Sequence, residues 1–423
     1  MDVEPLYRTF SIFETEDERK FRNEVRKFVH SEILPEADII EHEKLFPRHL
    51  FKKLGEKGYL RTLFPKSVGG TELGVTYGCI LGEEISWATQ ALTAALDCSI
   101  FGSIPIMRYG SEELKQKYLP KVLSGDYIAA IAMTEPGAGS DIIGSMRTRA
   151  VESDDGEYFI INGEKRFITN GSQADFLVLW AITDEQESPH SRISAFVIEP
   201  GFEGFEVVCD FNLMGVWGLK NSYLRFRNMK VPKENLIGKR GMGAEILLDE
   251  LDSERTLASA GACGIARRAL EIAAKHANKR IQFGTPIRRF EAINFKIADM
   301  TIKLEAARNL VYQSAKTIDA GLNASKISGI AKIFATDVAY EITNEALQIC
   351  GGLGYIKGEW NETQKKYLLP DGSNAYIVER LVRGSRLSKI TAGTNEILRY
   401  LVQREVFREM NLRAPKESQN WGD

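Results

Sequence analysis

The chain has 423 residues, of which 43% are hydrophobic and 27% charged, so it has enough apolar material for a large core and more than one domain. Its formal net charge is −3, with cations and anions interspersed, and this pattern gives no basic stripe for binding nucleic acid. The five cysteines and five histidines form no close cluster, so we expect no disulfide framework and no metal centre. The first residues lack a signal-peptide pattern, and the apolar run Phe176–Ile182 is far too short to span a membrane. This composition is typical of a cytoplasmic globular protein.

Residues 1–128 are predicted to form an N-terminal helical domain. Phe21, Val25 and Phe28 are spaced by three or four residues, which places them on one apolar face of a helix. Similar stripes occur near residues 50–54, 80–85 and 114–122, and prolines and paired glycines separate them.

Residues 129–240 change to short β-prone runs separated by turn residues, which predicts a middle β-barrel or sandwich domain. We expect strands over Tyr158–Ile161, Lys165–Ile168, Phe176–Trp180, Ala195–Ile198, Phe205–Val208 and Tyr223–Phe226. Asn162-Gly163 lies between the first two runs and predicts a hairpin there, because both central residues of such a turn need positive φ.

Residues 241–423 return to longer helices and are predicted to form a C-terminal four-helix bundle. Small residues at Ala258, Gly261 and Gly264 permit close approach between helices. We expect further bundle helices over residues 297–318, 328–350 and 395–410. The predicted fold is therefore an α+β multidomain one, in the order helical domain, β domain and helical bundle.

A glycine-rich loop, Met133–Asp141, lies at the junction between the helical and β regions. Gly137 and Gly139 let the backbone approach a ligand, while Thr134 and Ser140 supply hydroxyl groups. The loop fits neither a dinucleotide-binding nor a P-loop pattern, and an ordinary tight turn is the alternative interpretation.

Further along, Phe167 and Thr169 combine an aromatic ring with a hydroxyl group. Such a pair is suited to stacking on a planar heterocycle and hydrogen bonding to it. The two residues follow the glycine-rich loop by about 25 residues, so both segments are candidates for one binding site.

Five motifs together resemble the acyl-CoA dehydrogenase family over nearly the whole chain. They are Met133–Asp141, Phe167–Gly171 (with Phe where the family usually has Trp), Arg280–Gly284, Gln348–Tyr355 and Gly393–Ile397. The resemblance implies the fold order described above, an FAD cofactor, an acyl-CoA substrate and a homodimer or homotetramer in which a neighbouring subunit helps to hold the flavin. It also implies an electron-transferring flavoprotein or similar acceptor.

The resemblance assigns roles to individual residues. The implied cofactor-binding residues are Met133, Thr134, Gly139, Ser140, Phe167, Thr169, Arg280, Phe283, Gln348, Gly352, Thr394 and Glu396. The implied substrate-binding residues are Asp97, Ser140, Asp252 and Arg255, with Arg255 pairing with CoA phosphate or ribose groups. Taken alone, Arg280 has the alternative interpretation of a solvated cation at a helix end. Gly351-Gly352, taken alone, has that of a signal that ends a helix.

The position of the catalytic base departs from the common family pattern. Desaturation requires removal of an α proton, for which a carboxylate in a dry pocket is suited. Many members place a Glu directly before the Gly-Thr of the last motif, where this chain has Ala392. Members of the isovaleryl-CoA and long-chain types instead place it before an Arg on the first bundle helix, and Glu254 matches that position.

We therefore predict Glu254 as the base, against the alternative of an ordinary exposed helix carboxylate. Asp97 is the second candidate. The alternative interpretations of Asp97 are a specificity residue, a base that acts at an unusual position of the substrate, and a buried acid with satisfied hydrogen bonds.

A second departure is an insertion of roughly 17 residues near 356–375, which either caps the active site, mediates subunit contacts or forms a tolerated surface loop. The sequence also leaves alternative functions open. The same fold runs in reverse as an enoyl-CoA reductase or reacts with oxygen as an oxidase. The replacement of the usual Glu by Ala392 also suits a catalytically inactive flavoprotein that binds acyl-CoA.

Overall fold

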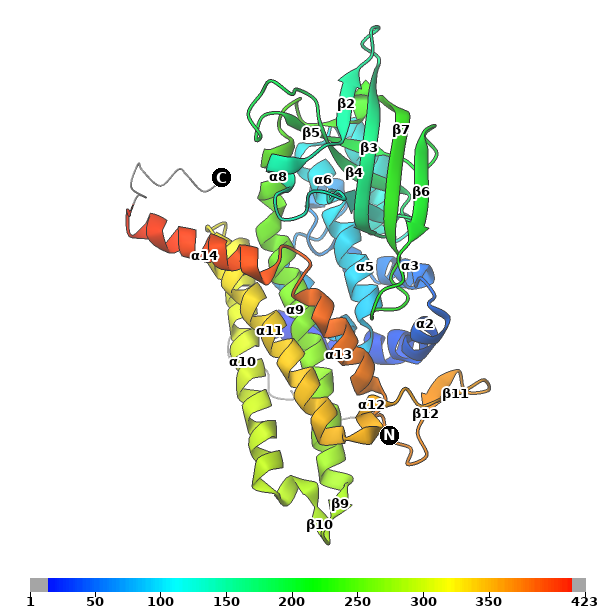
Figure 1. Cartoon of the computed structure of the whole chain (residues 1–423), viewed down its shortest axis with the longest axis vertical. Helices are drawn as coiled ribbons and strands as arrows, with labels where there is room; N and C mark the ends of the chain where they lie inside the picture. The colour runs from blue at the N-terminus through cyan, green and yellow to red at the C-terminus, as the bar shows by residue number, and fades with distance from the viewer. Residues whose placement is uncertain (1–13, 413–423) are drawn as a thin grey trace.

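The computed structural model describes residues 14–412. A helical part, a sheet and a helical bundle follow one another along the chain (Figure 1). The N-terminal helices are α1 (Glu16–Phe28), α2 (Ala37–Glu43), α3 (Arg48–Glu56), α4 (Val75–Ala88), α5 (Gln90–Phe101), α6 (Ile104–Tyr109) and α7 (Glu112–Leu123). Helix α1 begins with a capping box, in which Thr15 and Glu18 satisfy each other's backbone N–H groups. It buries Val25 and Phe28, as the apolar spacing predicts.

The middle region is an eight-stranded mixed sheet in the order β6-β7-β3-β2-β4-β5-β8, with β1 pairing in parallel with β4. Its elements are β1 (Ala129–Ala132), the short helix α8 (Ile142–Ser145), β2 (Arg149–Glu152), β3 (Tyr158–Thr169), β4 (Phe176–Ile182), β5 (Ile193–Ile198), β6 (Phe205–Asp210), β7 (Asn221–Pro232) and β8 (Leu236–Ile237). The runs expected in β4 to β7 are confirmed as strands.

Strand β4 lies between two apolar cores, which explains its uninterrupted apolar sequence. Phe176, Val178 and Trp180 belong to the core shared with the helices. Leu177 and Leu179 alternate with them and belong to the separate core of the β domain. Successive side chains of a strand point to opposite faces, so a strand covered on both faces is apolar throughout.

The hairpin predicted at Asn162-Gly163 is wrong, because β3 continues through both residues as one twelve-residue strand. The pairing with β7 shifts register between Ile161 and Gly163, so the segment forms an irregularity within the strand instead of a turn. A Cβ atom on Gly163 would lie 2.4–2.7 Å from atoms of Thr148. Glycine is therefore required here because the backbone at Thr148 of the same chain approaches closely. The sequence alone does not distinguish a glycine of this kind from a turn glycine.

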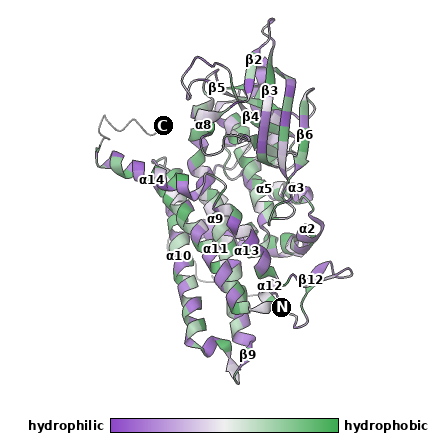
Figure 2. Ribbon diagram, viewed as in Figure 1, coloured by the Kyte–Doolittle hydropathy of each residue, from purple (hydrophilic) through white to green (hydrophobic). Residues whose placement is uncertain are grey.

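The C-terminal region is a bundle of long helices. Its elements are α9 (Gly243–Lys279), α10 (Glu291–Asp319), α11 (Ser325–Cys350), α12 (Gly352–Tyr355), α13 (Ile377–Ser388), α14 (Asn395–Glu409) and the short hairpins β9 (Ile281–Gln282)–β10 (Thr285–Pro286) and β11 (Glu359–Asn361)–β12 (Lys366–Leu368). The bundle helices alternate green and purple along their length, as expected of helices that each bury one face (Figure 2). A Cβ atom on Gly264 would lie 2.2 Å from the carbonyl oxygen of Glu83, so this glycine permits α9 to pack closely on α4.

A buried network of charges joins α1, α4, α9 and α10. Glu84 accepts hydrogen bonds from Arg22 at 3.0 Å and from Arg267 at 2.8 and 2.9 Å. Glu83 accepts from Arg22 at 3.2 Å and from the Nε of Arg308 at 3.0 Å. Burial alone would raise the pKa of Glu83, but Arg308, Arg22 and Arg267 lower it to about 2. Both carboxylates therefore stay ionised between the arginines and fix these four helices relative to one another.

The insertion folds back onto α2. The ring of Trp360 stacks on His42 with 3.9 Å between the ring centroids and an angle of 3° between the planes. His42 Nδ1 and the Tyr367 hydroxyl lie 3.0 Å apart, and Asp38 accepts from the Tyr376 hydroxyl at 2.7 Å. The β11–β12 hairpin therefore lies beside α2, away from the β domain (Figure 1).

Among residues 14–412, the stretch Gln90–Tyr109 alone has the length and mean hydropathy of a membrane-spanning helix. It comprises α5 and α6 and is 72% buried inside the protein, as expected of a core helix. No group of three or more metal-ligating side chains lies together in that part of the chain.

Candidate active site

The loop Met133–Asp141 is fixed to strand β3 directly before Phe167. Buried Lys165 donates to the carbonyl oxygen of Met133 at 2.9 Å and to Glu135 at 2.8 Å. The amide of Arg166 donates to the carbonyl oxygen of Thr134 at 2.7 Å. Thr134 and Phe167 are thus held by one hydrogen-bonded unit, as the two motifs predict.

The opposite side of this loop is open. Gly139 and Ser140 are exposed, and a Cβ atom added to Gly137 would meet no atom within 4 Å. The glycines leave free space over the backbone, as a ligand-binding loop requires.

Phe167 has an unusual backbone conformation for an aromatic residue, with φ at 62°. It lies where the pairing of β3 with β7 shifts register between Lys165 and Ile168. Its side chain is 58% exposed, and its ring centroid lies 5.3 Å from that of Phe211. A strained bulge that presents a bulky apolar ring outward is typical of a functional position.

Thr169, two residues later, lies against helix α5. Asn170 donates from Nδ2 to the carbonyl oxygens of Ala95 at 2.8 Å and Ala129 at 3.1 Å, which anchors the end of β3 to this helix. The hydroxyl of Thr169 interacts with the thiol of Cys98 on α5. Cys98 is therefore a site neighbour that the sequence motifs did not identify.

Glu254 on α9 lies close enough to Asp97 on α5 for its charge to act on that carboxyl. Burial, and after it the charge of Glu254, raise the pKa of Asp97 to about 7. Burial also raises the pKa of Glu254, opposed by the positive charges of Arg255 and Lys332. The half-buried pair therefore forms a carboxylate site in which a proton can be held near neutral pH.

Lys332 on α11 is a component of the site that sequence reasoning missed. It is fully buried and donates to the carbonyl oxygen of Gly393 and to Asn395 Oδ1, each at 2.8 Å. Burial lowers the pKa of Lys332 to about 8, against the charges of Asp337 and Glu254. The available sequence signal was a lysine between two apolar residues, Ala331 and Ile333, on α11. Lys332 links the last motif to Glu254.

The last motif itself forms the start of α14. Thr394 caps the helix by accepting from the amide of Ile397 at 3.3 Å, and Glu396 lies exposed in the first turn. Ala392 has φ at 56°, and Gly393 follows with φ at 80°. The loop is therefore a left-handed turn whose side chain at 392 is a methyl group.

Asp252 and Arg255 lie on α9 beside Glu254, but their contacts differ. Asp252 accepts hydrogen bonds from Ser325 at 2.9 Å, from Ser328 at 2.8 Å and from Arg255 at 3.3 Å, so it ties α9 to α11. Arg255 is buried, and its Nε has no hydrogen-bond partner in residues 14–412. Arg255 therefore has a side-chain N–H group that is not used within the described chain, whereas the Asp252 carboxylate is occupied.

The remaining sequence-predicted residues lie at the other end of the bundle. Arg280 ends α9, and Phe283 is 94% exposed with φ at 50°. Gln348 and Gly352 lie exposed at the end of α11, next to α12. Because 26 residues of α9 separate Glu254 from Arg280, about 39 Å of helix lies between them. One chain therefore does not bring the two sets together.

Glu250, one helical turn before Glu254, was also missed. Its side chain is 1% exposed, and neither carboxylate oxygen has a hydrogen-bond partner within residues 14–412. Burial, and after it the charge of Glu254, raise the pKa of Glu250 well above its usual value. The sequence places this acid among several exposed ones, which hides its burial.

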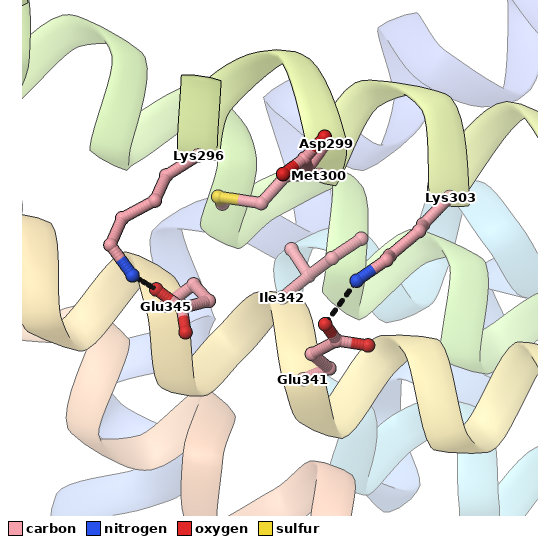
Figure 3. Close-up of a pocket in the computed structure, with 7 residues that line it drawn as sticks. All are labelled: Lys296, Asp299, Met300, Lys303, Glu341, Ile342 and Glu345. Atoms are coloured by element: carbon pink, nitrogen blue, oxygen red, sulfur yellow. Dashed lines mark hydrogen bonds and ion pairs between the residues drawn. The ribbon is translucent and has the colours of Figure 1, made fainter. Parts of the chain in front are cut away.

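Other cavities lie away from these residues in the described part of the chain. A groove of about 100 Å³ between α10 and α11 is crossed by the ion pairs Lys296–Glu345 and Lys303–Glu341 (Figure 3). It is too small for a cofactor and contains none of the residues described above. A cavity of about 310 Å³ lies between α2, α9, α13 and the insertion.

Known proteins match this architecture along most of the chain. The N-terminal, middle and C-terminal domain profiles of the acyl-CoA dehydrogenase family match residues 15–126, 130–229 and 241–407. An acyl-CoA dehydrogenase of Bacillus subtilis is 39% identical over 92% of this chain and 98% of its own length. A cyclohex-1-ene-1-carbonyl-CoA dehydrogenase of Geobacter metallireducens is 38% identical over 93% of this chain and 98% of its own length.

A solved structure gives the same result. The butyryl-CoA dehydrogenase of Megasphaera elsdenii superposes with a TM-score of 0.85 and 32% identity, covering 94% of this chain and all of that one. The chain belongs to the acyl-CoA dehydrogenase family, whose members are oxidoreductases that act on acyl-CoA.

Proposed function

We propose that this protein is an FAD-dependent acyl-CoA dehydrogenase that desaturates an acyl-CoA thioester between Cα and Cβ with Glu254 as the base. The observation that carries the proposal is the half-buried Glu254, whose pKa burial raises, beside a last motif that offers only the methyl group of Ala392. A carboxylate with a raised pKa is better matched to accepting an α proton near neutral pH than a solvated one.

The described residues fit a flavin. The outward ring of Phe167 and the hydroxyls of Thr134 and Thr169 suit a planar heterocycle, and Gly137 leaves open space. Arg280 has no hydrogen bond or ion pair to its side chain within residues 14–412, and it is exposed at a helix end. Such a guanidinium is free to pair with a pyrophosphate. Phe283, Gln348, Gly352, Thr394 and Glu396 are the other members of the proposed cofactor-binding set.

Each residue then has a defined task. Glu254 takes the proton from Cα of the thioester, and Lys332 holds the Gly393–Asn395 turn next to it. When bound, FAD supplies the acceptor for the hydride that leaves Cβ. Arg255, with an unpaired Nε, and Ser140, exposed on the loop, are proposed to contact the CoA moiety. An electron-transferring flavoprotein or similar protein then accepts the electrons.

The experiment that tests this function measures flavin content and flavin bleaching. Purified protein should carry about one non-covalent FAD per chain and bleach under anaerobic conditions with at least one of a panel of straight, branched, cyclic and aromatic acyl-CoA thioesters. Arg280→Ala should retain less FAD, because a charge-assisted phosphate contact is lost. Recovery of FMN, or a colourless protein that does not take up FAD, would contradict the proposal.

A second candidate follows from Asp97, whose pKa of about 7 also suits a base. If Asp97 takes the proton, the acidic C–H bond lies away from the usual α position. The similarity to a cyclohex-1-ene-1-carbonyl-CoA dehydrogenase favours unsaturated cyclic acyl groups as the first substrates to test for this reaction.

The same assay separates the other functions that the fold permits. An enoyl-CoA reductase would oxidise a reduced donor with an enoyl-CoA, and an oxidase would turn over with oxygen in place of an artificial dye. A yellow protein that binds acyl-CoA but bleaches with no thioester would be an inactive flavoprotein. The expected result is dye reduction with an acyl-CoA.

A further inference from the structure

The cavity of about 310 Å³ between α2, α9, α13 and the insertion has a strongly basic wall, and we call it the insertion pocket. The insertion contributes Lys365 and Lys366, α9 contributes Arg268, and α13 contributes Arg380. Asp38 on α2 is the one carboxylate among the described lining residues. Since four cations meet one anion, the pocket has an excess of positive charge.

Asp38 is already engaged. It accepts from Arg380 at 2.7 Å and from the hydroxyl of Tyr376 at 2.7 Å. At the surface, Lys365 pairs with Glu362 at 2.8 Å. Asp38 and Glu362 therefore compensate the positive charges of Arg380 and Lys365. Neither of these two carboxylates accepts a hydrogen bond from Arg268.

Arg268 is the decisive residue. It is 6% exposed, and its guanidinium lies 3.9 Å from the ring centroid of Trp87. No residue between 14 and 412 accepts a hydrogen bond from its side chain or forms an ion pair with it, although the guanidinium carries five N–H donors. Its neighbour Arg267, in contrast, donates twice to Glu84. Burial lowers the pKa of Arg268 to about 10, opposed mainly by the charge of buried Glu271 on the same helix, so it remains a cation at neutral pH.

The charge of Glu271 acts on Arg268, but none of residues 14–412 accepts a hydrogen bond from its guanidinium. Buried N–H donors without an acceptor are unfavourable, and an oxyanion would supply the missing acceptor. We propose that the insertion pocket binds a small anionic metabolite through its phosphate or carboxylate group, held by Arg268 and by Lys365 and Lys366 of the insertion. The cavity volume is at the lower end of the range for small-molecule sites. Oxyanions are the ligands that guanidinium and ammonium groups bind with charge-assisted hydrogen bonds.

The pocket is separate from the proposed catalytic site. Arg268 follows Glu254 by 14 positions on α9, a separation of about 21 Å along the helix. The proposal therefore does not depend on the identity of the acyl group or on the base. It also gives the insertion a function, because Lys365 and Lys366 belong to it.

The test measures binding of defined anions to the intact holoenzyme at constant ionic strength by calorimetry and by thermal unfolding. The probes are inorganic phosphate, AMP and succinate, with adenosine and chloride as the uncharged and simple-ion controls. Saturable binding is expected for at least one oxyanion probe, with a matching rise in the unfolding temperature. Binding by phosphate and AMP alone assigns a phosphoryl ligand, and binding by succinate alone assigns a carboxylate.

The variants decide whether the binding occurs in this pocket. The double variant Lys365→Ala, Lys366→Ala changes exposed side chains only, and it should weaken binding roughly tenfold to a hundredfold, as expected for lost hydrogen bonds between charged groups. Arg268→Gln should weaken it at least as much. Lys230→Ala, an exposed lysine on β7, is the matched control and should bind like the parent protein. No saturable binding of any oxyanion, or equal affinity in the double variant and in Lys230→Ala, would overturn the proposal.

Discussion

The sharpest prediction concerns Glu254→Gln. The amide keeps the size of the side chain but cannot take a proton, so FAD content and acyl-CoA affinity should stay close to those of the parent protein. The rate of flavin bleaching should fall by about 10²–10⁴-fold, which is the usual contribution of a general base. This range corresponds to about 2.7–5.5 kcal/mol of transition-state stabilisation.

The structure adds a second, pH-dependent signature through Asp97. Its pKa of about 7 results first from burial and second from the charge of Glu254. Glu254→Gln removes the second cause and keeps the first, so the pKa of Asp97 should fall without reaching its ordinary 3.8. Burial raises the pKa of Glu254, against the charges of Arg255 and Lys332, and the charge of Asp97 is not among the causes, so Asp97→Asn should leave the acidic limb of the rate profile close to its position in the parent protein.

Anaerobic stopped-flow measurements of oxidised-flavin absorbance, repeated across pH values on both sides of 7, give the rates and the profile. The matched variants are Glu254→Gln, Asp97→Asn and the double variant. In the double variant, any remaining pH dependence cannot come from this pair. A parent-like bleaching rate in Glu254→Gln, together with an inactive Asp97→Asn, would refute Glu254 as the base and place proton abstraction at Asp97.

Three further outcomes are expected. Glu250→Leu should stabilise the fold by about 1–3 kcal/mol, since an unsatisfied buried acid is removed. Because the pKa of Glu250 is raised in the folded state, the gain in unfolding free energy should grow as pH rises above 4.5, and urea unfolding at several pH values measures it. Arg267→Met should destabilise it by about 3–5 kcal/mol, because Glu84 loses its closest cation. The pKa values of Glu83 and Glu84 are lowered, that of Glu83 to about 2, so the stability they supply is present above about 4.5 and lost as pH falls below it; this variant should therefore show a shallower acid dependence. Ala392→Glu should partly restore bleaching in the Glu254→Gln background, and no rescue would mean that the left-handed turn cannot aim a carboxylate at the substrate.

The helices and most strands could be predicted because their signals are local. The apolar spacing of Phe21, Val25 and Phe28 and the alternating faces of β4 follow from the periods of helix and strand, and both appear as expected. Asn162-Gly163 misled the prediction because a glycine needed for close contact with Thr148 reads like a turn glycine. The difference depends on a neighbouring strand, which no local pattern contains.

The candidate site shows the same division. Glu254 was predicted from its motif, but Lys332, whose charge lowers its pKa, comes from α11, and Asp97, whose pKa it raises, comes from α5, both far away in the sequence. Lys332 and Glu250 differ from exposed lysines and glutamates only by burial, so their importance follows from packing alone. Sequence motifs therefore proposed the reacting group, and the tertiary structure supplied its electrostatic environment.

Helix α9 connects these observations to the assembly of the protein. Glu254 lies in the first third of this helix and Arg280 at its end, about 39 Å apart, and a rigid helix cannot fold back to bring both to one ligand. If both groups serve one flavin, Arg280 must come from a second copy, and FAD retention must depend on subunit association. Dilution or interface mutations that dissociate the protein should therefore release FAD and abolish activity together, whereas Glu254→Gln should lose activity with FAD retained. Light scattering combined with flavin absorbance measures both quantities in one experiment, and a monomer that keeps its FAD and its activity would show that the two ends of α9 serve different purposes.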